Sequence, residues 1–161
     1  MNLSQWFQTQ LHSSADGFAW SVEQVPPERR YVPPPRPLGE WSAARHAFHL
    51  LYYEQTIALP SLRQWLGGPM SFLRGQDEEA AWGRGQAVES LLAQFREIRA
   101  EQIAILPQFD DALWEETRRA VWGPVTLRWV VTKTYQHTAE HTHDVLSLAL
   151  YWAAVVAHLR E

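Results

Sequence analysis

The last long segment of the chain, from Thr126 to about Leu159, has the apolar periodicity of a single long helix. Successive helical residues are rotated by about 100°, so positions three, four and seven apart share one face. A line of residues within about 60° of one another therefore runs along this segment: Leu127, Val131, Thr134, Thr138, His141, Val145, Leu148 and Trp152. This stripe should face a core.

Three earlier segments show the same helical period and end at proline or glycine. The predicted helices run from Leu3 to about Val22, from Ala43 to Leu66 with a kink at Pro60, and from Gln86 to Leu106. Four long helices and one long connection are typical of a four-helix bundle, whose core commonly holds metal sites built from facing helices. The fold class we predict is all-α, in one domain over residues 1–161.

The connections differ in composition. Residues 26–39 contain six prolines, which predicts an extended crossover between the first and second helices. Residues 70–85 are rich in glycine and charge, which predicts a loop that could cover one end of the molecule. Residues 110–119 are predicted to form a short helix, and no segment shows the alternation expected of a strand.

Composition excludes several classes of function. The formal charge of −4 and the pI near 6.0 argue against a nucleic-acid surface, which needs clustered Lys and Arg. The chain has no cysteine, so it offers no disulfide, thiolate ligand or cysteine nucleophile. It also lacks a signal-peptide pattern and an apolar run long enough to cross a membrane. We expect a cytoplasmic protein that acts on a small molecule.

Two histidines one helical turn apart, His137 and His141, interrupt the apolar pattern of the last helix. His141 lies within the buried stripe and His137 about 80° from its centre, so both rings can converge on one point. A shared cation would satisfy both imidazoles. The alternative is a pair of core histidines bonded to polar neighbours. The segment also matches the H-x-x-E-H pattern of inverted zinc peptidases, but Glu140 points away from the stripe and should be exposed.

Tight binding of a divalent metal needs a third ligand from another helix, and the second predicted helix supplies His46 and His49. Periodicity does not choose between them, because this helix is apolar nearly all round. A helix of that kind must be buried on both sides. We therefore expect a homodimer, with the subunit interface around Tyr53 and Ile57.

Several charged residues are candidates for supporting roles. Asp144 follows the two histidines on the metal-facing flank, where it could orient a ligand imidazole, complete the coordination or remain solvated. Arg45, Arg96 and Arg99 could receive the carboxylates of a thiol cofactor, although arginines on helices usually face solvent.

The sequence resembles the DinB/YfiT-like family of metal-binding four-helix bundles, which is related to mycothiol- and bacillithiol-dependent transferases. The resemblance spans nearly the whole chain. It is carried by Gly39-Glu40-Trp41-Ser42 leading to His49-Leu50, by the helix from Phe95 to Leu106 with Arg99, by Gly123-Pro124-Val125-Thr126-Leu127, and by His137-x-x-x-His141. In that family the ligand of the second helix follows the Trp-Ser start by about two turns. The resemblance therefore implies a metal site of His49, His137 and His141, with the remaining coordination positions open to water or substrate.

Imidazole ligands suit zinc and nickel alike, and the sequence does not distinguish the two metals. The resemblance favours transfer of a low-molecular-weight thiol to an electrophilic small molecule. One alternative is a hydrolase that uses a water activated by the metal. Another is a stress-associated bundle that binds metal without catalysis.

Overall fold

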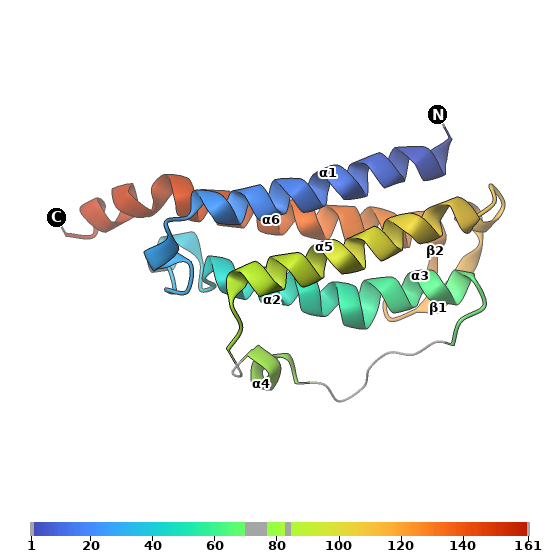
Figure 1. Ribbon diagram of the computed structural model, residues 1–161, viewed down its shortest axis with the longest axis horizontal. Helices are drawn as coiled ribbons and strands as arrows, with labels where there is room; N and C mark the ends of the chain where they lie inside the picture. The colour runs from blue at the N-terminus through green and yellow to red at the C-terminus, as the bar shows by residue number, and fades with distance from the viewer. Residues whose placement is uncertain (1, 70–76, 83–84, 161) are drawn as a thin grey trace.

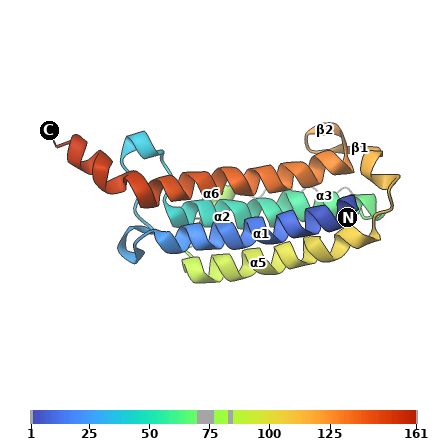
Figure 2. The same cartoon turned by 90° about the horizontal axis from the view of Figure 1, so that it is seen from above.

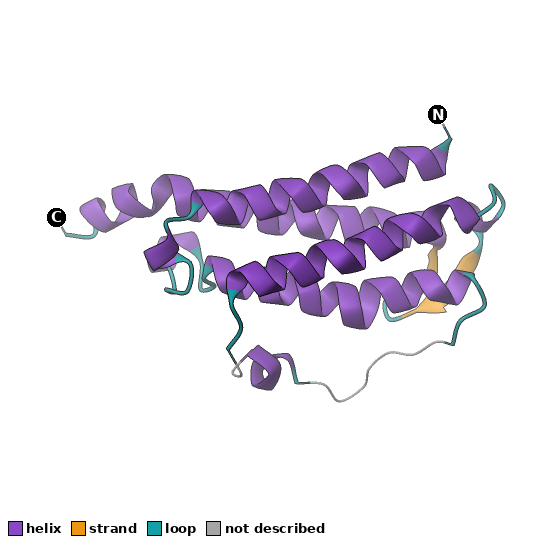
Figure 3. Cartoon of the chain, viewed as in Figure 1, coloured by secondary structure: helices purple, strands orange, loops and turns teal. Residues whose placement is uncertain are grey.

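The computed structural model describes residues 2–69, 77–82 and 85–160, and it confirms the predicted four-helix bundle (Figure 1). One corner of the bundle is formed by two helices joined end to end. The helices of the bundle are α1 (Leu3–Gln24), α2 (Ala43–Tyr53) continued by α3 (Leu59–Trp65), α5 (Val88–Ile105) and α6 (Leu127–His158). Among the described residues, the strands are confined to one small hairpin at an end of the bundle (Figure 3).

The Pro-rich connection follows from the order of the helices around the bundle. Both α1 and α2 pack against α5 and α6 and have few contacts with each other, so they occupy diagonal corners (Figure 2). A chain that leaves α1 must therefore cross the end of the bundle before α2 begins. Residues 26–42 make this crossing with two short 3₁₀ turns, Pro27–Arg29 and Arg36–Leu38, and Ser42 then caps α2 by accepting a hydrogen bond from the Arg45 amide.

The predicted stripe of α6 is buried as expected, since none of its eight residues is more than 9% exposed. The core that it enters is divided along the bundle. One apolar cluster surrounds Phe18, Phe95 and Leu148, and another surrounds Leu11, Leu62 and Leu127. Between the two lies a layer of buried polar side chains: Glu54, Arg99, Gln102, Thr134 and Thr138.

The helix predicted from Ala43 to Leu66 is interrupted just before Pro60. A π-helical turn, Glu54–Ala58, separates α2 from α3. Proline has no amide hydrogen to bond the carbonyl four residues earlier, so the chain near Pro60 cannot keep the regular α-helical ladder. Glu54, the first residue of this turn, is fully buried in the core.

The prediction of a short helix over residues 110–119 is wrong. The segment holds a 3₁₀ turn, Leu113–Glu115, followed by β1 (Thr117–Ala120), which pairs antiparallel with β2 (Gly123–Thr126). The expectation that the chain contains no strand fails with it. Both strands are too short and too polar to show apolar alternation. Gly123 takes a positive φ of 96° at the turn, a conformation open to glycine.

The loop predicted for residues 70–85 lies partly outside the described residues. Within it, Glu78–Trp82 forms the short helix α4, which packs against α2. The described part of this segment therefore lies beside the middle of a long helix, next to the predicted metal ligands, and contributes the side chain of Glu78.

The structure alters the argument for a dimer. Tyr53 is 7% exposed within the single chain, so it needs no second subunit to cover it. Exposed apolar side chains gather instead on the C-terminal turns of α6, which project beyond the rest of the bundle (Figure 1): Leu150, Tyr151 and Leu159 are each more than half exposed. The homodimer stays a prediction. No helix among the described residues is long and apolar enough to cross a membrane.

Candidate metal centre

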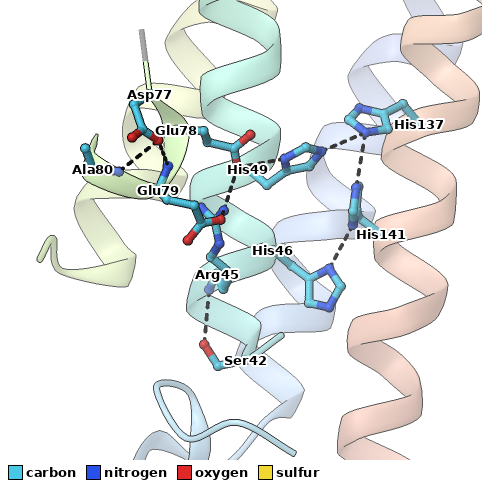
Figure 4. Close-up of polar contacts among 10 residues, drawn as sticks. All are labelled: Ser42, Arg45, His46, His49, Asp77, Glu78, Glu79, Ala80, His137 and His141. Carbon is cyan, nitrogen blue, oxygen red and sulfur yellow. Dashed lines mark hydrogen bonds and ion pairs between the residues drawn. The ribbon is translucent and has the colours of Figure 1, made fainter. Parts of the chain in front are cut away.

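The four histidines of the predicted metal region meet between α2 and α6 (Figure 4). His46 and His49 lie three residues apart on α2, and His137 and His141 lie four residues apart on α6, so each pair is separated by about one helical turn. Because residues four apart share a helix face, both rings of α6 turn toward α2. The structure therefore brings His49, His137 and His141 together, and it also brings His46 into the cluster.

Three ring nitrogens converge on one point. His137 Nε2 lies 3.1 Å from His49 Nε2 and 3.1 Å from His141 Nε2. Zinc bound by histidine at about 2.0–2.1 Å, with angles of about 90–110°, holds its ligand nitrogens about 2.9–3.4 Å apart. The observed spacing fits a divalent cation held by these three residues, with further coordination positions open.

The opposite ring nitrogens are held by partners that favour ligation. His49 Nδ1 is 2.9 Å from Glu78 Oε1, and His141 Nδ1 is 2.8 Å from His46 Nδ1. A ring that donates from Nδ1 keeps a free lone pair on Nε2, which is the form that binds a metal. His137 Nδ1 is buried and has no hydrogen-bond partner among the described residues.

Burial favours the neutral imidazole in His46, His137 and His141. Desolvation, followed by the charge of His49, lowers the pKa of His137 to about 3. Desolvation, followed by the charges of His137 and His46, lowers the pKa of His141 to about 2. The pKa of His46 falls to about 4 for the same leading reason. Neutral imidazole is the form required of a metal ligand.

Two aromatic rings shield the cluster. The ring of Tyr53 lies 4.2 Å from the ring of His137, and Trp41 stacks parallel to His141 at 6.0 Å. Tyr53, which the sequence analysis placed at a subunit interface, is buried within the single chain. Burial, with a further contribution from Glu54, raises the pKa of its hydroxyl, so Tyr53 remains protonated.

The arginines proposed for a thiol cofactor are largely committed elsewhere. Arg99 is 1% exposed, with Nη2 2.7 Å from Glu54 Oε1 and 2.8 Å from Thr138 Oγ1. Arg45 is paired with Glu78 at 3.0 Å and with Glu79. Only Arg96 is exposed, and it lines a separate hollow between α1 and α5. None of the three lines the cleft beside the histidines.

The remaining candidates lie as follows. Glu140 is exposed and bonds Gln136, so it does not act as the base of a peptidase at this cluster. His143 is exposed on the far side of α6. Asp144 makes no hydrogen bond to the histidines, but an oxygen of it lies within 4.8 Å of nitrogens of His46 and His141. Its carboxylate lines the adjacent cleft.

An open cleft of about 670 Å³ lies against the cluster. His46 and His141 form part of its wall, and the rest comes from the Pro-rich connection and from α6. This volume is within the usual range of small-molecule sites. A molecule in the cleft would therefore lie next to the candidate metal centre.

Glu78 was not identified from the sequence, and its role can be tested. Loss of a carboxylate that bonds a ligand imidazole typically costs about 10–100-fold in metal affinity. We expect Glu78→Ala to weaken zinc binding by about that factor, as measured by competition with a chromogenic chelator. Glu79→Ala is the matched control, because Glu79 contacts Arg45 and no histidine. Equal affinities for the two variants would contradict the role of Glu78.

Comparison with known proteins relates the sequence to a protein family and the fold to a solved structure. A sequence model of the DinB superfamily matches residues 10–145. A similar solved structure is that of YfiT from Bacillus subtilis, described as a probable metal-dependent hydrolase with an unusual four-helix bundle topology. The TM-score is 0.75 at 18% sequence identity, and the match covers 94% of this chain and 91% of YfiT. A search of curated proteins finds no match to the sequence.

Proposed function

The chain belongs to the DinB superfamily, and we propose that it is a metal-dependent hydrolase whose divalent ion is held by His49, His137 and His141. The observation that carries the proposal is the convergence of three Nε2 atoms beside an open cleft. Three neutral protein ligands and open positions are typical of a catalytic site and not of a closed structural one. The description of YfiT as a probable metal-dependent hydrolase supports the same reading.

A bound divalent ion would supply a Lewis acid, which makes water nucleophilic near neutral pH and polarises a carbonyl or phosphoryl oxygen. Zinc and nickel both suit the ligands. The protein's own contribution is to hold three imidazoles in place through Glu78 and His46, and to exclude bulk water with Trp41 and Tyr53.

The position and hydrogen bonding of His46 favour hydrolysis over thiol transfer and over metal binding without catalysis. If His141 binds metal through Nε2, its Nδ1–H donates to His46 Nδ1, and the hydrogen of His46 must then be on Nε2. His46 lines the cleft, and its Nε2 has no partner among the described residues. A fixed N–H at this wall can donate to an oxygen on which negative charge develops during acyl transfer.

The proposal predicts hydrolysis that depends on metal. Protein loaded with about one zinc or nickel ion per chain should hydrolyse members of a panel of small esters and amides without added thiol. Chelation should abolish the rate, and added metal should restore it. Thiol transfer, suggested by the family resemblance, makes the opposite prediction: turnover of an electrophile only with a thiol, and a sulfur-to-metal charge-transfer band in cobalt-substituted protein. Inactivity in both assays would favour a bundle that only binds metal.

A further inference from the structure

The cleft beside the histidines has a distinctive charge. Its wall carries two carboxylates, Glu40 from the Pro-rich connection and Asp144 from α6. Neither makes a hydrogen bond or an ion pair with another described residue. No Lys or Arg is among the described residues that line the cleft. The described lining therefore carries two carboxylates and no ammonium or guanidinium group to pair with them.

Arg45, which directly precedes the lining residue His46, does not neutralise this charge. Arg45 precedes His46 on α2 but is 5% exposed, and it turns away from the cleft toward α4. There it pairs with Glu78 at 3.0 Å and with Glu79, and it lies over the rings of Trp82 and, at 4.9 Å, of Trp41, on whose face it already makes a cation–π contact. A side chain held by two carboxylates is not available to bind a substrate anion.

The other walls suit an apolar body. Leu38 and Trp41 lie on one side, and Tyr151, which is 54% exposed, lies on the other. An aromatic face attracts an ammonium group and accepts apolar groups equally well. Carboxylates together with aromatic faces are the usual means of recognising organic cations.

One buried polar group points to a ligand independently of the carboxylates. His46 is 7% exposed, and its Nε2 lacks a protein partner while the residue lines the cleft. With His141 bound to metal, this nitrogen is a hydrogen-bond donor at the inner end of the cleft. A carbonyl oxygen of a bound molecule would satisfy it.

We infer that the cleft binds a small organic cation, an amine or quaternary ammonium compound with an apolar body and an acyl group presented to His46 and the metal centre. This inference rests on the proposed function, because it takes the three histidines as the reactive end of the cleft. Glu40 and Asp144 select the cationic group, and Tyr151 contacts the apolar body. Phosphate esters and thiols that carry carboxylates are disfavoured by the same two residues.

Two probes of similar size and opposite charge test the inference: benzyltrimethylammonium and benzylsulfonate. Neither is a good metal ligand, so their affinities measure recognition by the cleft and not coordination of the metal. Titration calorimetry at about 0.15 M salt, with metal-loaded and metal-free protein, should show the ammonium binding on the order of 10-fold more tightly. The Glu40→Gln/Asp144→Asn double variant should reduce that preference to about 2-fold or less. Glu97→Gln is the control, because Glu97 is exposed on α5 away from the cleft.

Equal or tighter binding of the sulfonate would overturn the inference, as would failure of the ammonium to bind to either form of the protein. A preference unchanged in the double variant would place the cation elsewhere and have the same consequence. The proposed function fails differently. If the protein prefers the ammonium but takes up no metal, the cation site at Glu40 and Asp144 stands, and both the hydrolase and the placement of the acyl group at a metal are rejected. If it takes up metal and hydrolyses only anionic esters, the hydrolase stands and the cation site is rejected.

Discussion

The His137→Ala/His141→Ala double variant is expected to lose nearly all of its zinc or nickel after dialysis, whereas the unmodified chain should retain about one ion. The reason is geometric. His137 Nε2 lies 3.1 Å from each of the other two candidate donors, so it is central to the set. Removal of two of three imidazoles leaves one ligand, which cannot hold a divalent ion against chelating buffer. Metal content measured by plasma mass spectrometry checks this.

His143→Ala is the matched control for the same helix. His143 is exposed and belongs to neither group of candidate ligands, so its loss should leave the metal content unchanged. The structural effect of the double variant must also be separated from its effect on the metal. Far-ultraviolet circular dichroism should remain that of a helical bundle, because the apolar residues of α6 are untouched. Full retention of metal by a folded double variant would reject the site.

The pair on α6 was predictable because helical period alone determines which residues share a face. His137 and His141 lie four apart, and the stripe around His141 contains six fully buried residues that mark the inward side: Leu127, Val131, Thr134, Thr138, Val145 and Leu148. Helical periodicity does not determine whether His46 or His49 is the third ligand. Both reach the cluster, but His49 meets Nε2 of His137 whereas His46 meets Nδ1 of His141, and periodicity does not show which ring nitrogen a side chain will meet. The family resemblance selected His49.

Other parts of the site depend on tertiary placement that no local pattern encodes. Glu78 reaches His49 from a short helix, 29 residues further along the chain. The hairpin of β1 and β2 consists of four-residue strands, too short for a periodic signal. Glu54 is buried at the start of the π-helical turn, and its partners Arg99 and Gln102 come from another helix.

Glu54 also leads to the largest expected change in stability. Glu54 is fully buried, and its charge is balanced by Arg99, with Gln102 as a further hydrogen-bond donor. We expect Arg99→Met to lower the free energy of unfolding by about 3–5 kcal/mol, because Glu54 then remains buried without a counterion. Urea denaturation of metal-free protein provides the measurement. Arg96→Met, on the exposed face of the same helix, should change stability by less than about 0.5 kcal/mol.

A second variant shows whether the cost comes from uncompensated charge or from lost packing. Glu54→Gln/Arg99→Met removes both charges and keeps an amide of similar shape beside Gln102, so it should recover more than half of the loss. Recovery of nothing would show that packing and not charge dominates.

The pH dependence of the free energy of unfolding also distinguishes uncompensated charge from lost packing, and it needs no second substitution. Burial raises the pKa of Glu54, while Arg99 and Gln102 oppose the rise, so loss of Arg99 should raise the pKa further. A carboxyl whose pKa is higher in the folded state binds its proton preferentially there, and stability then increases as the pH falls. The histidines with lowered pKa have the opposite effect, but they are common to both proteins. The difference in stability between the unmodified chain and Arg99→Met should therefore shrink as the pH is lowered from neutral toward the ordinary pKa of glutamate. A difference that is constant with pH would mean that Glu54 has the same protonation state with and without Arg99, and that the buried ion pair is not the source of the loss.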